Sequence, residues 1–77
     1  MIPTEKEVTD LALATYLSVI GHRLIFTPKS QYGKKTIFVF QGSKKLEADI
    51  LDFYNRVARV DPLSFAEVFR NLKALVL

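Results

Sequence analysis

The stretch that decides the fold, His22–Gly42, reads HRLIFTPKSQYGKKTIFVFQG. Two runs rich in β-branched and aromatic residues flank a segment that contains Pro28 and Gly33. Such runs are typical of strands, and a segment of this kind between them is typical of a hairpin loop longer than two residues. We therefore predict a β-hairpin over residues 22–42, with strands near 23–27 and 36–41.

Alternation within these strands predicts a ribbon with two apolar faces. Leu24 and Phe26 are expected on one face of the first strand, and Phe38 and Phe40 on one face of the second, with Val39 opposite. Apolar residues on both faces are typical of strands that are covered on both sides. Because a two-stranded ribbon is marginally stable alone, we expect helices to cover one face. The other face, or an open strand edge, is expected to bind a second copy of the chain, with a four-stranded sheet across the homodimer.

A helix is predicted before the hairpin, over residues 9–21, and the polar residues 1–8 are expected to form a lead-in. Thr9 is the expected N-cap of this helix, and Gly21 is expected to end it, because glycine readily takes the left-handed conformation found after helices. Apolar residues continue around most of the helix circumference. A helix of this kind is usually covered on most of its sides.

Two further helices are predicted after the hairpin, over residues 43–57 and 61–76. Ser43 is the expected N-cap of the first, and Asp61 followed by Pro62 is a typical helix start. The residues expected to face the core are Leu46, Ile50, Phe53, Tyr54 and Val57 on the first helix, and Phe65, Phe69, Leu72 and either Leu75 or Val76 on the second. The prediction is a single α+β domain over residues 1–77, in the order helix–hairpin–helix–helix.

Length and composition limit the kinds of protein that the chain can be. It has 77 residues, of which 49% are apolar, with no cysteine and one histidine. Disulfides are excluded, and an all-protein zinc site is not expected. A core of this size is small, so we expect the homodimer to add stability. The longest apolar run, Leu11–Ile20, is half the ~20 residues needed to span a bilayer, and no signal-peptide pattern is present, so we expect a cytoplasmic protein without a membrane partner.

Charge is distributed unevenly along the chain. The segment Leu11–Leu46 contains six Lys or Arg residues and no Asp or Glu, whereas the remaining residues contain five basic and eight acidic ones. Positive charge gathered on one segment is typical of an anion-binding surface. The residues predicted to contact nucleic acid are Arg23, Lys29, Tyr32, Lys34, Lys35, Lys44 and Lys45.

Three blocks of the sequence resemble a known family. DLALATYLSVIGH at residues 10–22 and RVDPLSFAEVFRNLKALV at residues 59–76 are similar to the opening and closing segments of a small uncharacterised family of bacteria and their phages, a domain of unknown function. IFVF at residues 37–40 resembles the aromatic strand of that family. The resemblance implies an α-β-β-α-α order and a bacterial or phage origin, and it carries over no catalytic residue.

Residues that could perform catalysis do not form a recognisable constellation. Asp49 and Asp52 stand three apart on a predicted helix and could share a metal, but acidic rows of this kind are usually solvated. His22 follows the glycine that ends a helix, where hydrogen bonds to the helix carbonyls are a more common role than proton transfer. We therefore expect no enzyme activity, no metal site and no cofactor.

These observations predict a small accessory binding protein encoded by a phage or mobile element and acting in the bacterial host cell. Its lead function is nucleic-acid binding through a basic hairpin tip, where lysines would contact phosphates and Tyr32 would stack on a base. DNA and RNA both remain open as partners. Two alternatives remain: an adaptor or inhibitor that binds a protein through exposed apolar helix surface, and a structural homodimer in which the lysines provide solubility.

Overall fold

The computed structural model describes residues 5–27 and 36–76 and confirms the α+β class. The helices and the hairpin strands form near the predicted positions, and one further strand precedes them. In chain order the elements are β1 (Glu5–Val8), α1 (Leu11–Val19), β2 (Leu24–Phe26), β3 (Phe38–Gln41), α2 (Lys44–Tyr54) and α3 (Pro62–Val76).

The sheet has three strands in the order β1-β3-β2, and both pairings are antiparallel. Glu5 lies opposite Gln41 and Val8 lies opposite Phe38, so the predicted lead-in is wrong for residues 5–8. β3 is the central strand, and its residues 38–40 are all buried. The prediction that the aromatic strand is covered on both faces is therefore confirmed.

The pairing of β2 with β3 is irregular. Leu24 lies opposite Phe40, but Phe26 lies opposite Val39, so two steps along β2 correspond to one step along β3. This offset is a β-bulge, which bends an edge strand and interrupts its alternation. The alternation predicted between Leu24 and Phe26 is therefore interrupted at the bulge.

The third strand changes the sheet that two copies of the chain could form. β1 occupies the edge of β3 that a two-stranded ribbon would leave open, so two copies joined edge to edge would form six strands rather than four. The available edges are then β1, which carries alternating charges over Glu5–Val8, and β2, which is short and bulged. Charge, short length and bulges all disfavour edge pairing. The homodimer itself stays a prediction.

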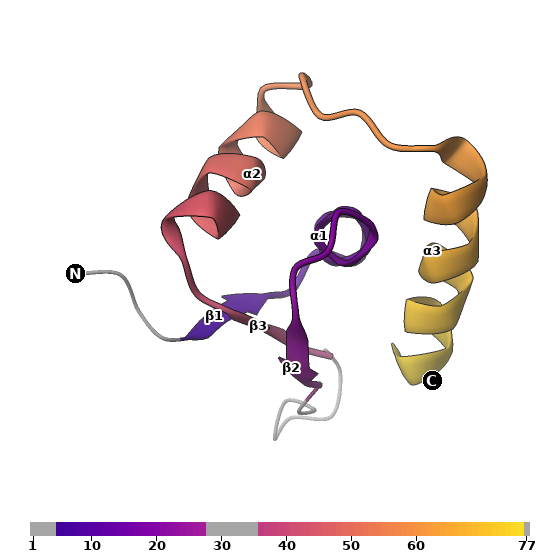
Figure 1. The fold of residues 1–77 in the computed structure, drawn as a ribbon. Coiled ribbons are helices and arrows are strands. Elements are labelled where there is room, and N and C mark those ends of the chain that lie inside the picture. The colour runs from indigo at the N-terminus through magenta and orange to yellow at the C-terminus, as the bar shows by residue number, and fades with distance from the viewer. Residues whose placement is uncertain (1–4, 28–35, 77) are drawn as a thin grey trace.

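Helix α1 lies at the centre of the molecule. Figure 1 shows it end-on, with the sheet below it and α2 and α3 on opposite sides. This arrangement explains why α1 is apolar around most of its circumference, because three sides of the helix face protein. The buried apolar residues that form the core are Val8, Leu13, Ala14, Tyr16, Leu17, Phe38, Phe40, Leu46 and Leu72.

Each helix begins at a capping side chain. Asp10, rather than the predicted Thr9, caps α1, since its Oδ1 accepts hydrogen bonds from the N–H groups of Ala12 at 2.9 Å and Leu13 at 3.3 Å. Both residue types cap helices well, and the adjacent β1 strand leaves Asp10 at the point where the chain turns. The two other predicted caps are confirmed: Ser43 Oγ accepts from Leu46 N–H at 3.0 Å, and Asp61 Oδ2 accepts from Ser64 N–H at 2.8 Å.

Helix α2 ends at Tyr54, three residues before the predicted end at Val57. Arg56 takes a left-handed conformation, with φ of 63°, and the helix does not continue to Val57. Val57 is 61% exposed and Tyr54 59% exposed, so neither completes the apolar face predicted for this helix. Leu46 is buried, and Ile50 and Phe53 pack against the core as predicted.

Helix α3 packs its Phe65, Val68 and Leu72 toward the core. Phe69 is half-buried and stacks on Phe65, with ring centroids 6.1 Å apart. Leu75 is 46% exposed, so it does not extend the predicted buried face, and the side chain of Val76 lies outside the described residues.

Candidate functional site

The seven predicted nucleic-acid residues fall into two groups. Four of them lie outside the described residues: Lys29, Tyr32, Lys34 and Lys35. The other three, which we call the ribbon-base cations, are Arg23, Lys44 and Lys45, and all three are exposed. They lie where β2 begins and where β3 leads into α2, at the opposite end of β2 from the start of the loop. The described residues therefore do not gather all the predicted cations at one hairpin tip.

Two local structures bring the ribbon-base cations together. Gly21, with φ of 101°, ends α1 and lets the chain reverse into β2, where the carbonyl of Arg23 accepts from Gln41 N–H at 3.0 Å. Ser43 then caps α2, which places Lys44 and Lys45 in its first turn. The unpaired N–H groups of a helix N-terminus add partial positive charge at this position.

The three cations differ in their electrostatic partners. Lys45 Nζ lies 3.3 Å from Asp49 Oδ2, one helical turn along α2. No carboxylate of the described residues lies within ion-pair distance of Arg23 or Lys44. Arg23 and Lys44 are thus the ribbon-base cations whose charge is least compensated by acidic side chains of the described fold.

His22 forms a contact that the sequence did not reveal. Its Nε2 lies 2.5 Å from Asp49 Oδ2, and both side chains are nearly buried, at 12% and 10% exposed. Because an ionised carboxylate has no proton, Nε2 carries the proton and donates it. The predicted contact of the His22 side chain with helix carbonyls is wrong; its backbone N–H instead donates to Leu17 O at 2.9 Å.

Asp49 is held in its ionised form by these neighbours. Burial acts to raise the pKa of Asp49, but hydrogen bonds from His22 and Lys45 outweigh burial and hold the pKa below its ordinary value. On α1, burial raises the pKa of Tyr16, and the charges of Asp49 and Asp52 raise it further. The pair of His22 and Asp49 therefore joins the end of α1 to α2 through a charged contact at the edge of the core.

The burial of Asp49 has a detectable signal in the sequence. Asp49 stands three residues after Leu46 and four before Phe53, within the stripe that faces the core, so the prediction that it is a solvated acid is wrong. A carboxylate in such a position requires a hydrogen-bonding partner. Which residue supplies the partner could not be predicted, because His22 is distant in sequence and meets Asp49 through the tertiary fold.

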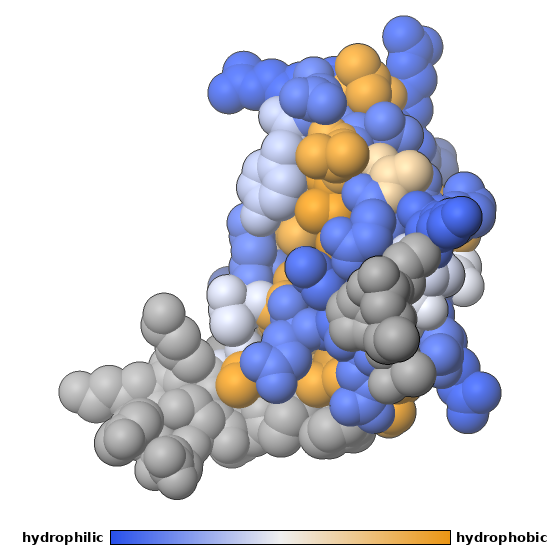
Figure 2. Space-filling model, turned by 90° about the vertical axis from the view of Figure 1, so that its left-hand side faces the viewer, coloured by the Kyte–Doolittle hydropathy of each residue, from blue (hydrophilic) through white to orange (hydrophobic). Residues whose placement is uncertain are grey.

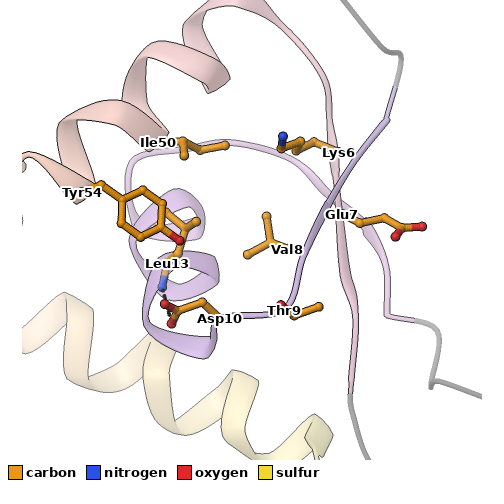
Figure 3. A pocket seen from close by; sticks show the side chains of 8 residues that line it. All are labelled: Lys6, Glu7, Val8, Thr9, Asp10, Leu13, Ile50 and Tyr54. Atoms are coloured by element: carbon orange, nitrogen blue, oxygen red, sulfur yellow. Dashed lines mark hydrogen bonds between the residues drawn. The ribbon is translucent and has the colours of Figure 1, made fainter. Parts of the chain in front are cut away.

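A pocket of about 220 Å³ lies on another part of the molecule, where β1 and the start of α1 meet α2. Figure 3 shows Val8 and Leu13 inside it, with Ile50 and Tyr54 closing the side formed by α2. The remaining lining residues are polar: Lys6, Glu7, Thr9 and Asp10. No residue of this pocket is among the predicted site residues.

Two further observations bear on the kinds of site present. No group of three or more potential metal ligands occurs among residues 5–27 and 36–76. Within the same ranges, every helix is too short or too polar to cross a membrane.

Comparison with known proteins identifies the chain at the level of its family. No curated protein and no solved structure matches it. One family model matches residues 4–77, nearly the whole chain, and confirms the resemblance to an uncharacterised family. The chain belongs to the family described as domain of unknown function DUF5659.

Proposed function

We propose that the chain is a non-catalytic accessory protein that binds nucleic acid through cations of the β2–β3 ribbon, in the cytoplasm of a bacterial cell and encoded by a phage or mobile element. The observation that carries the proposal is the charge of Leu11–Leu46, which contains six basic residues and no acidic one. Nucleic-acid backbones attract such segments strongly because binding releases condensed counterions.

The ribbon-base cations support this proposal within the described fold. Arg23 and Lys44 are exposed and have no carboxylate of the described residues within ion-pair distance. The Lys45 side chain is 76% exposed, and its partner Asp49 also receives a hydrogen bond from His22. We expect these side chains to contact phosphates, and Tyr32 in the loop to stack on a base.

The test is a titration of short fluorescent single-stranded DNA, duplex DNA and RNA at ~50 mM and ~200 mM salt, followed by anisotropy. One variant changes Lys29, Lys34 and Lys35 to alanine, and a second changes Arg23 and Lys44 to glutamine. Each lost phosphate contact is expected to reduce the salt slope on duplex DNA by about 0.9. The nucleic acid whose affinity falls most in these variants is assigned as the preferred partner.

A matched control distinguishes the loss of specific contacts from the loss of net positive charge. Arg70 and Lys73 are exposed cations on α3, distant in sequence from the ribbon, and changing both to glutamine removes the same charge as the second variant. We expect this control to bind like the unchanged chain. An equal loss in the control, or no measurable binding of any of the three ligands at the lower salt, would contradict the proposal.

A second candidate function, binding to a protein, is favoured by exposed apolar residues around the connection from α2 to α3. Figure 2 shows orange patches among polar side chains on the face that carries α2. Four large apolar residues of this region are between 59% and 79% exposed: Leu51, Tyr54, Val57 and Leu63. Exposed apolar residues that gather in one region are typical of protein interfaces.

The two functions respond to different substitutions. A protein-binding module would tolerate loss of the ribbon cations and would be impaired by Leu51→Ser together with Leu63→Ser. The proposed homodimer is a separate prediction, made from the apolar faces and edges of the hairpin. Light scattering at micromolar concentration tests it: we expect the mass of two chains, and the mass of one chain would exclude the dimer.

A further inference from the structure

We propose that the pocket between β1, α1 and α2 binds an organic cation with an apolar body, such as an arylalkyl-ammonium or guanidinium group. This site is separate from the ribbon cations, and its test does not depend on nucleic-acid binding. Three features of the pocket favour such a ligand: its aliphatic walls, its uncompensated charge and the ring of Tyr54.

The walls favour an apolar body. Val8 from β1, Leu13 from α1 and Ile50 from α2 contribute aliphatic surface from three different elements. Val8 and Leu13 belong to the buried core, and Ile50 packs against it, so these walls are fixed by the fold. At about 220 Å³, the pocket is smaller than the roughly 300–1,000 Å³ typical of drug-sized ligands. It therefore suits a small ring or a short alkyl chain.

The charge of the pocket favours a cation. Figure 3 shows Lys6 extended along the rim toward α2, where its Nζ lies 3.8 Å from Glu47 Oε1. Asp10 lies at the end of the pocket formed by α1, and its Oδ1 caps that helix, whereas its Oδ2 has no hydrogen-bond donor within the described part of the chain. Glu47 offsets Lys6, and the full negative charge of Asp10 exceeds the roughly half positive charge of the α1 N-terminus that it caps, so this end of the pocket stays negative.

Tyr54 adds a surface that cations prefer. Figure 3 shows its ring on the side of the pocket formed by α2, with the hydroxyl directed toward Leu13. The face of an aromatic ring attracts ammonium and guanidinium groups, by about 0.5–1 kcal/mol at exposed sites. The ring and the carboxylate together would hold the charged head of a ligand, while the aliphatic walls hold its body. An anionic ligand would meet Asp10 unfavourably.

The test compares three ligands of similar shape and different charge. Phenethylammonium, the neutral 2-phenylethanol and the anionic 3-phenylpropionate are each titrated into ¹⁵N-labelled protein, and amide shifts are followed by NMR. We expect phenethylammonium to bind with a dissociation constant on the order of 1 mM and to shift the amides of Val8, Leu13 and Ile50. 2-Phenylethanol should bind more weakly and 3-phenylpropionate weakest.

Variants of the two recognition groups sharpen the assignment. Asp10→Asn keeps a good helix cap but removes the charge. It should weaken the binding of phenethylammonium about threefold and leave the binding of 2-phenylethanol unchanged. Tyr54→Ala should weaken the binding of phenethylammonium about fivefold. The matched controls are Asp61→Asn, the corresponding cap of α3, and Leu51→Ala, an exposed neighbour on α2, and neither should change binding.

A capped arginine residue distinguishes the source of the cation. Tighter binding of capped arginine than of phenethylammonium assigns the pocket to an arginine side chain of a partner protein, and the reverse order assigns it to a free amine. Equal or tighter binding of 3-phenylpropionate, unchanged binding in Asp10→Asn, or amide shifts confined to other parts of the chain would each overturn the proposal.

Discussion

The ends of α1 and α2 have the same pattern of backbone hydrogen bonds but different surroundings. In both, the two N–H groups that come after the helix donate back into its last turn: His22 to Leu17 O and Gly21 to Ser18 O in α1, and the N–H groups at positions 57 and 56 to Asp52 O and Phe53 O in α2. This is the Schellman pattern, which requires a left-handed residue after the helix.

The difference lies in the residue that takes the left-handed conformation and in the side chain next to it. Gly21 supplies this conformation in α1 without steric cost, and His22 then directs its side chain to the nearly buried Asp49. In α2 the residue is Arg56, and Val57 after it is 61% exposed. The helix-ending hydrogen bonds therefore form at α2 without a glycine, and at α1 the residue after the turn, His22, joins the helix end to α2.

The largest expected effect comes from breaking the contact at the end of α1. Asp49→Asn keeps the shape of the side chain but removes its charge, so His22 loses a charge-assisted hydrogen bond. We expect a loss of about 2 kcal/mol in the free energy of unfolding near neutral pH. Urea denaturation measures this loss, and Asp52→Asn, an exposed aspartate on the same helix, is the control and should change little.

The same variant should change how stability depends on pH. The pKa of Asp49 is lower in the folded chain than in the unfolded one, so its contribution is present above the unfolded pKa of about 3.9 and is lost as pH falls through the folded pKa. Asp49→Asn should therefore lose less stability than the unchanged chain when the pH is lowered below about 4. Parallel pH profiles for the two proteins would contradict the role given to the contact.

The next effect tests the glycine itself. Gly21→Ala should destabilise the fold by about 1.5 kcal/mol, because an L-residue at this positive φ is strained. Apart from its chain neighbours, a Cβ at this position would meet no atom within 4 Å, so the cost would come from the backbone conformation. Gly21→Asn is the matched control, since asparagine tolerates left-handed conformations, and thermal unfolding should place it between alanine and glycine.

The smallest effect is a gain at the end of α2. Arg56→Gly removes the strain of a left-handed residue with a side chain and should stabilise the fold by up to about 1 kcal/mol. Arg59→Gly is the control, because Arg59 does not have positive φ and gains nothing from glycine. Chemical denaturation measures both variants. An equal change in the free energy of unfolding would contradict the strain assigned to Arg56.

Much of the fold could be predicted because local signals are strong where they occur. Ser43, Asp61 with Pro62, and Gly21 each mark a helix boundary through a side chain or a conformation particular to that residue type. The predicted end of α2 is too late because Val57 continues the apolar spacing, and no glycine marks the turn at Arg56. Where the apolar pattern and the backbone signal disagree, the position of a helix end cannot be predicted from local sequence alone.

Strand β1 could not be predicted from its local sequence. Its residues EKEV alternate in charge rather than in hydrophobicity, and Val8 is the one member of the strand that is buried. Such a segment forms a strand because β3 offers it a partner, and that pairing is a tertiary contact. The same reason explains the pair of His22 and Asp49, which no local pattern could join. The role of the ribbon-base cations in binding stays a prediction, whereas their place at the end of the strands away from the loop follows from the predicted hairpin.

The strand order β1-β3-β2 has a consequence for how the chain is made. β1 leaves the ribosome first, but its partner β3 emerges only after α1 and β2 have been synthesised. During that interval the nascent chain carries a strand without a partner and a helix that is apolar on most sides. Because this closure joins distant segments, we expect the sheet to form late, when β3 inserts between the two earlier strands, and the core to be completed when α2 and α3 follow.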